Sequence, residues 1–504
     1  MRSLSTTTDR SSWLIVGLVA LGVIFTALDQ TVVVTVLPEI MLDMEIQVTD
    51  LDLASWIITG YLLGYTVAIP LVARISDAYG HSLVLRISLV VFGVGSALVA
   101  LAPNLPWLVS ARVLQAVGGG AIIPVGMALV AQHLPGHRKA VAVGIVGAAA
   151  EIGIVLGPLY GGGITSALGW RWLFWLDIPQ AAIILLAIWA IPNRRGPETK
   201  VDYLGGLLLA ATLTLLVIAL SQRGLFTISS PTAYLIAAAG VLLVPALILS
   251  QVRRDQPLLA PAFFRSGAAL SSLATKLLVG AALIIALVTV PLMANTVHGQ
   301  SPLDGGLRLM RLTGAIPLAA LLGGYLTYRI GARPVTLVGL IVAAVGLFLI
   351  STWELDISDP QLSAHLVVAG AGFGLVIAPL FVTAMEAGHR DYQATAASLV
   401  TVSRMIGMAL GLAALSAWGM EHFRGLTAGL ELPIQQAGET AQALELRIQE
   451  YQDGLNQAGI TLFQAFFRAA AALMLAGLVP ALWLAGKARA PKEGPEEIKL
   501  ADSP

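Results

Sequence analysis

Four charged residues lie inside stretches that are otherwise apolar enough to span a membrane: Asp29, Arg112, Glu151 and Arg404. A charge at the centre of a bilayer costs on the order of 3 kcal/mol or more unless it finds a partner or water. Such residues therefore form ion pairs or lie on pathways for ions and protons. A carboxylate beside a guanidinium is suited to binding a proton, because the neighbouring charge sets how readily the acid is protonated.

The positions of these residues along their helices predict two pairs. Glu151 and Arg404 each lie about 10 residues from the start of their helices, which at about 1.5 Å per residue places both roughly 16 Å deep. Asp29 and Arg112 match in depth in the same way, nearer the other side of the membrane. Two purely structural salt bridges are the alternative interpretation.

A run of small residues follows Glu151 in the same helix: Gly153, Gly157, Pro158, Gly161 and Gly162. The spacing places glycines on one helix face, where another backbone can approach closely. Pro158 removes a backbone hydrogen bond and permits a bend. A lone GxxxG indicates only helix packing, whereas the full GxxxGPxxGG pattern is more specific and predicts a moving helix interface.

The composition is that of a membrane protein. Of 504 residues, 57% are hydrophobic and 12% are charged, whereas soluble proteins carry about 25% charged residues. The net charge is zero and no long basic tract occurs, which disfavours nucleic-acid binding. Without cysteine or an H-x-x-x-H pair the usual metal sites are missing, so we expect neither a metal nor another cofactor. An enzyme or a non-transporting scaffold is disfavoured, because no nucleophile–base set is visible.

Windows of about 20 apolar residues, the length that spans a bilayer, recur fourteen times along the chain. They predict an all-α membrane protein in a 6+2+6 arrangement, with helices near 13–37, 52–73, 83–102, 106–132, 140–166, 172–191, 204–222, 232–250, 268–296, 303–327, 335–352, 362–386, 394–422 and 460–486. We expect a six-helix bundle over 1–191, two linker helices over 192–264, a second bundle over 265–486 and a tail over 487–504.

Lys and Arg gather in the loops on one side, which places both termini in the cytoplasm by the positive-inside rule. One connection on the other side is long, at residues 423–459. Its Ala, Leu, Glu and Gln content favours helix, and we expect an ordered protrusion, with a solvated linker as the alternative. Lys276, Arg308 and Arg311 also lie in helices and receive no role from the sequence; Lys276 fits either snorkelling or a water-filled cavity.

The sequence resembles the major facilitator superfamily, in its fourteen-helix drug–proton antiporter branch. The motifs that carry this resemblance are LDQTVVV at 28–34, SDAYG at 76–80, RVLQAVGG at 112–119, WRWLFWLDIP at 170–179 and the Gly153 to Gly162 run. Within that branch, GYLLGYTVAIPL (60–71), LVVAGAGFGLVIAPL (366–380) and SRMIGMALGLAALSAWG (403–419) are similar to the mycobacterial triacylglyceride exporters, which work with a periplasmic lipid-carrying lipoprotein.

One motif departs from the family pattern. The loop after the second helix keeps Asp77 and Gly80, but Ala78 replaces an Arg and His81 with Ser82 replace a basic pair; Tyr328 stands where the second half would have an Asp. The resemblance implies that Asp77, Gly80 and the glycine run take part in conformational gating. The departures concern the closure of the cytoplasmic gate and not the fold.

The resemblance implies a proton-coupled secondary transporter in the inner membrane of a bacterium, with two bundles that rock about a central cavity. Asp29 would carry the proton beside Arg112, and Glu151 with Arg404, on equivalent helices of the two halves, would form an ion lock between the halves. The expected substrate is an apolar lipid, a triacylglyceride or related glycolipid; a multidrug–proton antiporter for hydrophobic drugs is the alternative. We expect a monomer that contacts membrane lipids. A periplasmic lipid-carrying lipoprotein is a possible binding partner.

Overall fold

A computed structural model describes the chain from residue 4 to residue 484. Residues 48–50, 135–136, 190, 194–200, 221–229, 255–265, 355–356, 388–392, 431 and 434–439 are not described, and neither are some side chains within helices, including that of Glu151. The described part of the chain is helical throughout and contains no strand. This confirms the predicted all-α class, since a helix satisfies its own backbone hydrogen bonds in lipid.

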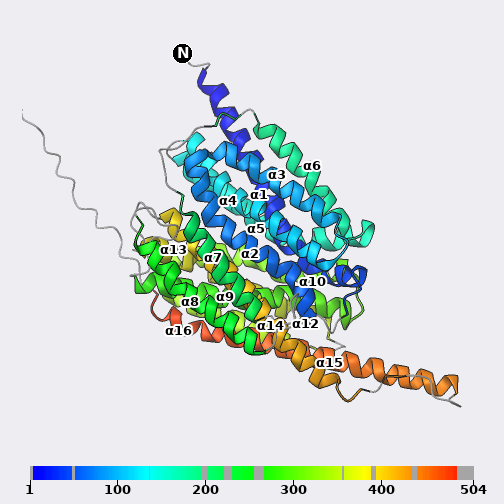
Figure 1. Ribbon diagram of the computed structural model, residues 1–504. Coiled ribbons are helices and arrows are strands. Elements are labelled where there is room, and N and C mark those ends of the chain that lie inside the picture. Colours follow the sequence, from blue (N-terminus) through cyan, green and yellow to red (C-terminus); the bar gives the residue numbers. More distant parts are fainter. Residues whose placement is uncertain are drawn as a thin grey trace, which may run out of the picture.

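The first six helices form the region drawn from dark blue to turquoise in Figure 1. α1 packs along α5, both α2 and α3 pack against α4, and α6 lies against α3. Their bounds are α1 Leu4–Asp43, α2 Leu51–Tyr79, α3 His81–Ala100, α4 Leu105–His133, α5 His137–Leu168 and α6 Arg171–Ile188.

The next two helices, α7 Tyr203–Leu220 and α8 Ser230–Val252, pack against each other. α7 also contacts α2 and α14, so this pair lies beside both groups of helices rather than apart from them. The Asp202 carboxylate, just before α7, accepts a hydrogen bond from the Gln251 side chain of α8 at 2.7 Å and pairs with Arg254 at 2.8 Å. The two helices are therefore tied together at one end.

The remaining helices form the green to red region of Figure 1. α9 packs along α14, α12 packs against both α10 and α11, and α15 lies against α9 and α11. Their bounds are α9 Gly267–Thr296, α10 Pro302–Ile330, α11 Ala332–Ile350, α12 Asp359–Leu375, α13 Ile377–Ala387, α14 Gln393–Thr427, α15 Ala441–Ala476 and α16 Leu478–Ala481.

Two spans expected as single helices are interrupted. α12 ends at Leu375 and α13 begins at Ile377, while α15 ends at Ala476 and α16 begins at Leu478. In both places a proline, Pro379 or Pro480, lies four residues after the last helical residue. A proline has no N–H to donate to the carbonyl four residues earlier, and its ring clashes with that carbonyl. The sequence windows showed the apolar length but not these breaks.

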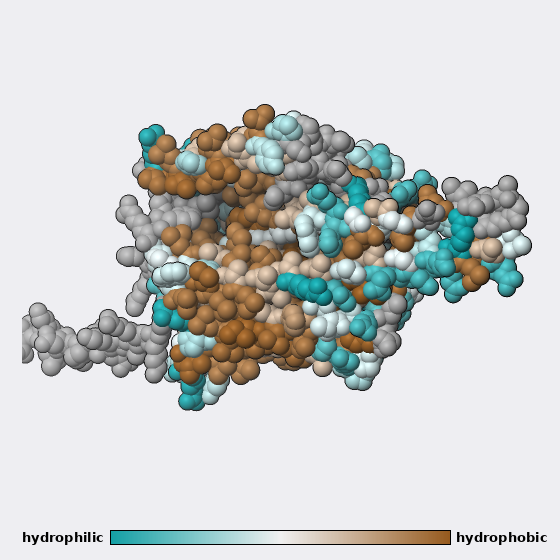
Figure 2. All heavy atoms as spheres, turned by 90° about the horizontal axis from the view of Figure 1, so that it is seen from below, coloured by the Kyte–Doolittle hydropathy of each residue, from teal (hydrophilic) through white to brown (hydrophobic). Residues whose placement is uncertain are grey.

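Thirteen helices in the described part are long and apolar enough to cross a membrane, and Tyr203–Ala219 is a shorter apolar helix. Leu186, Leu318 and Leu321 are more than 70% exposed, and Figure 2 shows broad brown patches over the body of the molecule. A monomeric soluble protein does not expose apolar area on this scale. The chain is a multi-pass membrane protein.

The two large groups of helices meet along α5 with α10 and along α2 with α14. The contact is close where α5 ends and α10 begins, because a Cβ added at Gly162 would lie 2.6 Å from the Pro302 carbonyl oxygen. Nearby, a narrow apolar cavity of about 10 Å³ lies between Leu37, Ile58, Val288 and Phe466. A cavity of this size holds a single water at most. The helices are therefore tightly packed at this end of the bundle.

Candidate functional site

Asp29 and Arg112 form a buried ion pair between α1 and α4. Arg112 Nη1 donates to both carboxylate oxygens of Asp29, at 3.0 Å to Oδ1 and 2.9 Å to Oδ2. The side chains are 2% and 1% exposed, and Arg112 is among the largest fully buried side chains of the described part. The structure therefore brings together the two residues that matched in depth in the sequence. Their role in proton coupling stays a prediction.

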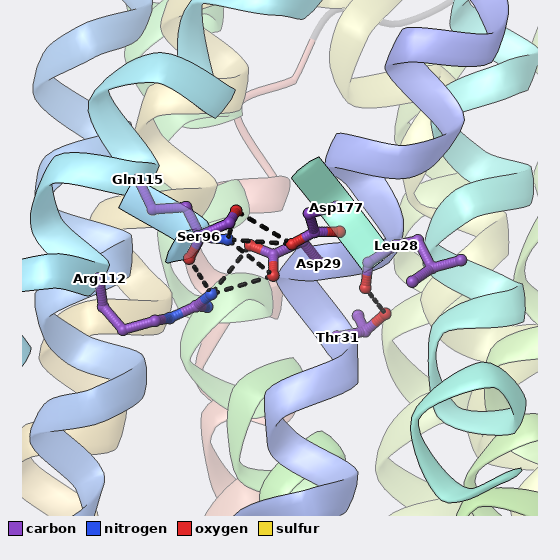
Figure 3. A network of polar contacts seen from close by, with 7 residues as sticks. All are labelled: Leu28, Asp29, Thr31, Ser96, Arg112, Gln115 and Asp177. Atoms are coloured by element: carbon purple, nitrogen blue, oxygen red, sulfur yellow. Dashed lines mark hydrogen bonds and ion pairs between the residues drawn. The ribbon is translucent and has the colours of Figure 1, made fainter. Parts of the chain in front are cut away.

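Three further polar residues complete this network, as Figure 3 shows. Gln115 lies one turn after Arg112 on α4 and accepts a hydrogen bond from Arg112 Nη1 at 2.6 Å. Its Nε2 faces Asp29 Oδ1 at 3.3 Å, Ser96 Oγ at 2.8 Å and Asp177 Oδ2 at 3.3 Å. Ser96 Oγ in turn donates to Asp177 Oδ2 at 3.1 Å. Two carboxylates on α1 and α6 are thus linked through one amide.

Asp177 was not among the predicted site residues. It lies in α6, is 5% exposed and stands within the apolar window 172–191 that the sequence had marked as a helix. A carboxylate in such a window is the same signal that identified Asp29 and Glu151. Asp177 lies in the WRWLFWLDIP segment, and its charge within an apolar window is the signal that identifies it from the sequence.

Aromatic rings surround the guanidinium. Arg112 Cζ lies 4.1 Å from the centre of the Tyr61 ring and 5.5 Å from that of Phe174. A cation over an aromatic face gains about 0.5–2 kcal/mol, the larger value where water is excluded. Arg112 Nε is buried without a hydrogen-bond partner in the described part. The guanidinium therefore holds the carboxylate through one nitrogen rather than through a two-nitrogen fork.

Glycines allow the helices that carry these residues to approach. A Cβ at Gly95 of α3 would lie 2.6 Å from the backbone nitrogen of Gln115, so α3 can bring Ser96 next to α4. On α5, a Cβ at Gly161 would lie 2.7 Å from the Val32 side chain of α1, and Gly153 and Gly157 also face α1 without room for a side chain. The predicted glycine face therefore exists, and α1 is the helix that covers it.

Gly162 and Pro158 face a different helix. Gly162 lies against Pro302 and Leu303 at the start of α10, and a Cβ at Gly306 of α10 would collide with the Pro158 carbonyl oxygen. The glycine run therefore packs α5 on two neighbours, α1 within its own group of helices and α10 across the interface. Whether this interface moves during a functional cycle stays a prediction.

The predicted Glu151–Arg404 lock falls partly outside the described part, because the Glu151 side chain is not described. Arg404 of α14 is half-buried, and its backbone lies against Gly280 of α9. The helix that carries it, α14, packs against α2 of the other group of helices. Arg404 is thus positioned between the two groups of helices, and the lock itself stays a prediction.

Asp77 and Gly80 lie at the turn from α2 to α3. Gly80 has φ +100° and precedes α3, a conformation that side chains rarely adopt. Asn193, which follows α6, donates to the Tyr79 carbonyl oxygen at 2.9 Å and accepts from the Leu83 N–H at 3.1 Å. This turn is therefore tied to the end of α6, a link that the sequence did not indicate.

The corresponding turn between α10 and α11 has the same geometry. Gly331 has φ +97° and precedes α11, and Tyr328, three residues earlier, is 87% exposed. Asp77 holds the equivalent place in the first turn, where it lies 4.0 Å from His81 Nε2. The two turns thus share a backbone shape while their polar residues differ.

The three basic residues without a predicted role occupy different environments. Lys276 of α9 is buried, with Nζ 5.5 Å from the centre of the Phe381 ring. Arg311 of α10 pairs with Asp359 at 2.7 Å. Arg308 belongs to α10 and lies close to His298, a half-buried residue of the loop between α9 and α10. Burial lowers the pKa of His298, and the Arg308 charge lowers it further.

The described part of the long connection is mainly helical; residues 431 and 434–439 within it are not described. α15 is one continuous helix from Ala441 to Ala476, and its first half extends well beyond the bundle in Figure 1. Leu430 packs on Gly454, which joins the two arms of the protrusion. Leu446 and Leu432 are 58% and 64% exposed, so apolar side chains remain uncovered on it.

A surface hollow of about 300 Å³ lies at the base of the protrusion, lined by Trp418, Glu421, His422, Gly425 and Leu426 of α14. The Trp418 and His422 rings are stacked with centres 5.4 Å apart. Trp418 also contacts Phe466 of α15, with ring centres 6.0 Å apart. An aromatic cluster therefore joins α14 and α15 where the protrusion leaves the bundle.

Two packed groups of helices and a buried, hydrogen-bonded ion pair within the membrane part are features that secondary transporters share. Comparison with known protein families gives the same class. The profile of the Major Facilitator Superfamily matches residues 19–412, and the chain belongs to this family.

Relatives of similar length carry a common name. The triacylglyceride transporter of Mycolicibacterium hassiacum is 37% identical over 95% of this chain and 93% of its own. The triacylglyceride transporter of Mycolicibacterium smegmatis is 36% identical over 96% and 89%, and that of Mycobacterium tuberculosis strain H37Rv is 35% identical over 96% of both chains.

Among solved structures, a bacterial homologue of the human lysosomal transporter Spinster covers 94% of this chain and 98% of its own, with a TM-score of 0.62 at 18% identity. The D-xylose–proton symporter covers 92% and 97%, with a TM-score of 0.60 at 16% identity. At such identities the likeness concerns the fold alone.

Proposed function

We propose that this protein is a proton-coupled secondary transporter that exports an apolar lipid, a triacylglyceride or a related glycolipid, across a bacterial cytoplasmic membrane by alternating access. The observation that carries the substrate class is the identity of 35–37% with three triacylglyceride transporters over nearly the whole chain. The helices over 1–191 and 265–486 act as the two moving bundles of a monomer, with 192–264 as linker and both termini in the cytoplasm.

The proton site is the Asp29–Arg112 pair. Protonation removes the carboxylate charge that holds the guanidinium, so the attraction between α1 and α4 weakens when a proton binds. The pair is buried, and a buried charge that loses its partner is strongly destabilising. Proton binding therefore favours a rearrangement of these helices, which is the coupling step.

The lock between Glu151 and Arg404 would bias one state of the cycle. Arg404 lies on α14, which packs against α2 across the interface, and Glu151 lies two residues before the first glycine of the run that packs on α1. An ion pair formed in one state and broken in the other gives each state a different energy. The glycine run and the Gly80 turn then supply the surfaces along which the bundles move.

The protrusion supports lipid export over drug export. A triacylglyceride cannot leave into water, because each exposed CH₂ costs about 0.8 kcal/mol. The exposed apolar side chains of α15, Leu446 and Ile448 among them, offer an apolar surface on which the lipid passes to an apolar acceptor such as a lipid-carrying lipoprotein. A drug pump of the same family does not need such a surface.

Reconstitution into vesicles tests this proposal. Proteoliposomes with a pH gradient would contain a fluorescent triacylglyceride, and its extraction by an apolar acceptor outside would be followed over time. We expect gradient-dependent extraction that stops when the gradient is dissipated. Gradient-driven ethidium efflux without lipid transfer would instead establish the multidrug antiporter. Lipid transfer at the same rate with and without the pH gradient would exclude proton coupling.

A further inference from the structure

We propose that Asp177 is a second proton-binding group of the transporter, and that it carries the proton in the conformation described here while Asp29 remains ionised beside Arg112. The inference uses the proposed proton coupling only for what happens after Asp29 is protonated. The occupancy of Asp177 is a separate claim, which follows from the charges and contacts of the buried network (Figure 3).

The first argument is charge balance. Asp29 and Asp177 are 2% and 5% exposed, and both lie in a network with a single guanidinium. Arg112 contacts Asp29 directly, whereas no basic side chain of the described part forms an ion pair with Asp177. An ionised Asp177 would be a buried charge without a cation of its own, which is costly. One proton on Asp177 makes the site neutral.

The second argument is the kind of contact that Asp177 makes. Its Oδ2 accepts from two neutral donors, Ser96 Oγ at 3.1 Å and Gln115 Nε2 at 3.3 Å. A carboxylic acid keeps one oxygen as a carbonyl acceptor and carries its proton on the other. Two neutral donors on Oδ2 leave Oδ1 able to carry a proton, and neither donor supplies the positive charge that would stabilise an ionised carboxylate. Asp29, by contrast, accepts charged hydrogen bonds on both oxygens, as an ionised group does.

The third argument is that Gln115 connects the two acids. Its Oε1 accepts from Arg112, which fixes the orientation of the amide, so Nε2 must face the carboxyl groups. That nitrogen has two hydrogens but three acceptors within 3.3 Å, on Asp29, Ser96 and Asp177. The contacts to the two acids therefore compete, and a change of charge on one acid changes the hydrogen bonding of the other.

A balanced step follows. When Asp29 takes up a proton from solution, Arg112 loses its counter-charge, and ionisation of Asp177 restores it by breaking the Oδ1–H bond and releasing that proton. One proton enters and one leaves, and the site is neutral before and after. Among the residues that the structure describes, the other titratable side chains near these groups are phenols: Tyr61 of α2 and Tyr160 of α5.

Infrared spectroscopy of the purified protein in nanodiscs tests the occupancy of Asp177 without any substrate. We expect a carboxylic-acid carbonyl band at neutral pH that Asp177→Asn removes. Ser96→Ala, which deletes the hydrogen bond from Ser96 to Asp177 and the one that Ser96 accepts from Gln115, should shift this band. Two control variants should leave it unchanged: Ser110→Ala, whose hydroxyl donates to the Pro106 carbonyl on the exposed side of α4, and Asp43→Asn, in an exposed pair with Arg171.

A band that Asp177→Asn leaves intact, or one whose frequency ignores Ser96→Ala, would overturn the assignment. If Asp177→Asn fails to fold, the change in band frequency caused by Ser96→Ala decides whether Asp177 is protonated. Transport separates this inference from the proposed function: Asp177→Asn should lose uphill transport and keep downhill exchange. Undiminished uphill transport by Asp177→Asn would refute the release of a proton from Asp177. If the unsubstituted protein shows the Asp177 band but moves no lipid, only the proposed substrate is refuted.

Discussion

Gly306 of α10 lies directly against the Pro158 carbonyl oxygen of α5, so closely that no side chain fits between them. Pro158 belongs to the glycine-rich run that the sequence singled out, and Gly306 comes from the other large group of helices. The close approach of α5 and α10 at this point is possible because Gly306 has no Cβ atom. A small substitution here should therefore destabilise the packed conformation of this interface more than it destabilises the fold.

Gly306→Ala should weaken the packed arrangement of α5 and α10 by about 1–3 kcal/mol, the usual cost of inserting a methyl group into a filled contact. We expect slower transport and a shift toward states in which this interface is open, measured as distances between spin labels on α5 and α10. Gly314→Ala is the matched control, because nothing lies within 4 Å of a Cβ at that position of α10. Equal effects of both substitutions would contradict the prediction.

Asp29→Asn should abolish gradient-driven transport, because the site then lacks the carboxyl group that takes up the proton. The loss of stability should be smaller than the about 3–5 kcal/mol typical of a broken buried pair, since Asp177 lies nearby and can balance Arg112. Thermal unfolding in detergent and pH-gradient-driven uptake measure the two effects. Arg112→Leu should be the more destabilising change, as it leaves the ionised Asp29 without a cation.

A surface pair provides the comparison for Asp29. Asp43→Asn breaks an ion pair with Arg171 whose side chains are 39% and 37% exposed, and pairs of this kind contribute about 0–1 kcal/mol. We expect normal uphill transport from this variant. Full gradient-driven transport by Asp29→Asn would show that the proton binds elsewhere.

Glu151→Gln and Arg404→Ala should each reduce transport if the two residues form a lock, because either change removes the attraction that distinguishes the two states. The charge-swapped double variant should recover part of the activity, since the pair is restored in reverse. Transport rates of the four proteins form a double-mutant cycle. Full activity in both single variants, or simple additivity, would rule the lock out.

Removal of residues 430–457, with a short linker joining the ends, should stop lipid release while lipid binding to the membrane part survives. The reason is that α15 offers apolar side chains beyond the bundle. Extraction of a fluorescent triacylglyceride measures release, and quenching of protein fluorescence by the bound lipid measures binding. Export at the normal rate by the shortened protein would remove the support for lipid hand-off and favour the drug antiporter.

Point variants separate surface contacts from packing within the protrusion. Leu446→Ser and Ile448→Ser change exposed side chains of α15 and should slow release with little change in stability. Leu430→Ser removes the side chain that packs on Gly454 and should lower the melting temperature of the protrusion. If only Leu430→Ser affects release, the apolar residues serve to hold the arms together.

The sequence was sufficient for the helices and for part of the site. Apolar windows identified the spans, since a bilayer accepts few other structures, and charges within those windows identified Asp29 and Arg112. The windows could not show that Pro379 and Pro480 interrupt two spans, because several other helices contain proline and remain continuous. Whether a proline breaks a helix depends on what packs beside it.

Local sequence determined which residues share a helix face, and tertiary structure decided what covers that face. Gly153, Gly157 and Gly161 recur at helical spacing, so their common face was readable, but only the packing shows that α1 covers it while Gly162 turns toward α10. The same holds for Asp177: the sequence shows an acid in a span, and only the approach of α3, α4 and α6 brings Ser96, Gln115 and Asp177 to one point. Helical periodicity is set by bonds between near neighbours, whereas these contacts join residues more than 60 positions apart, and their geometry exists only when the whole bundle is assembled.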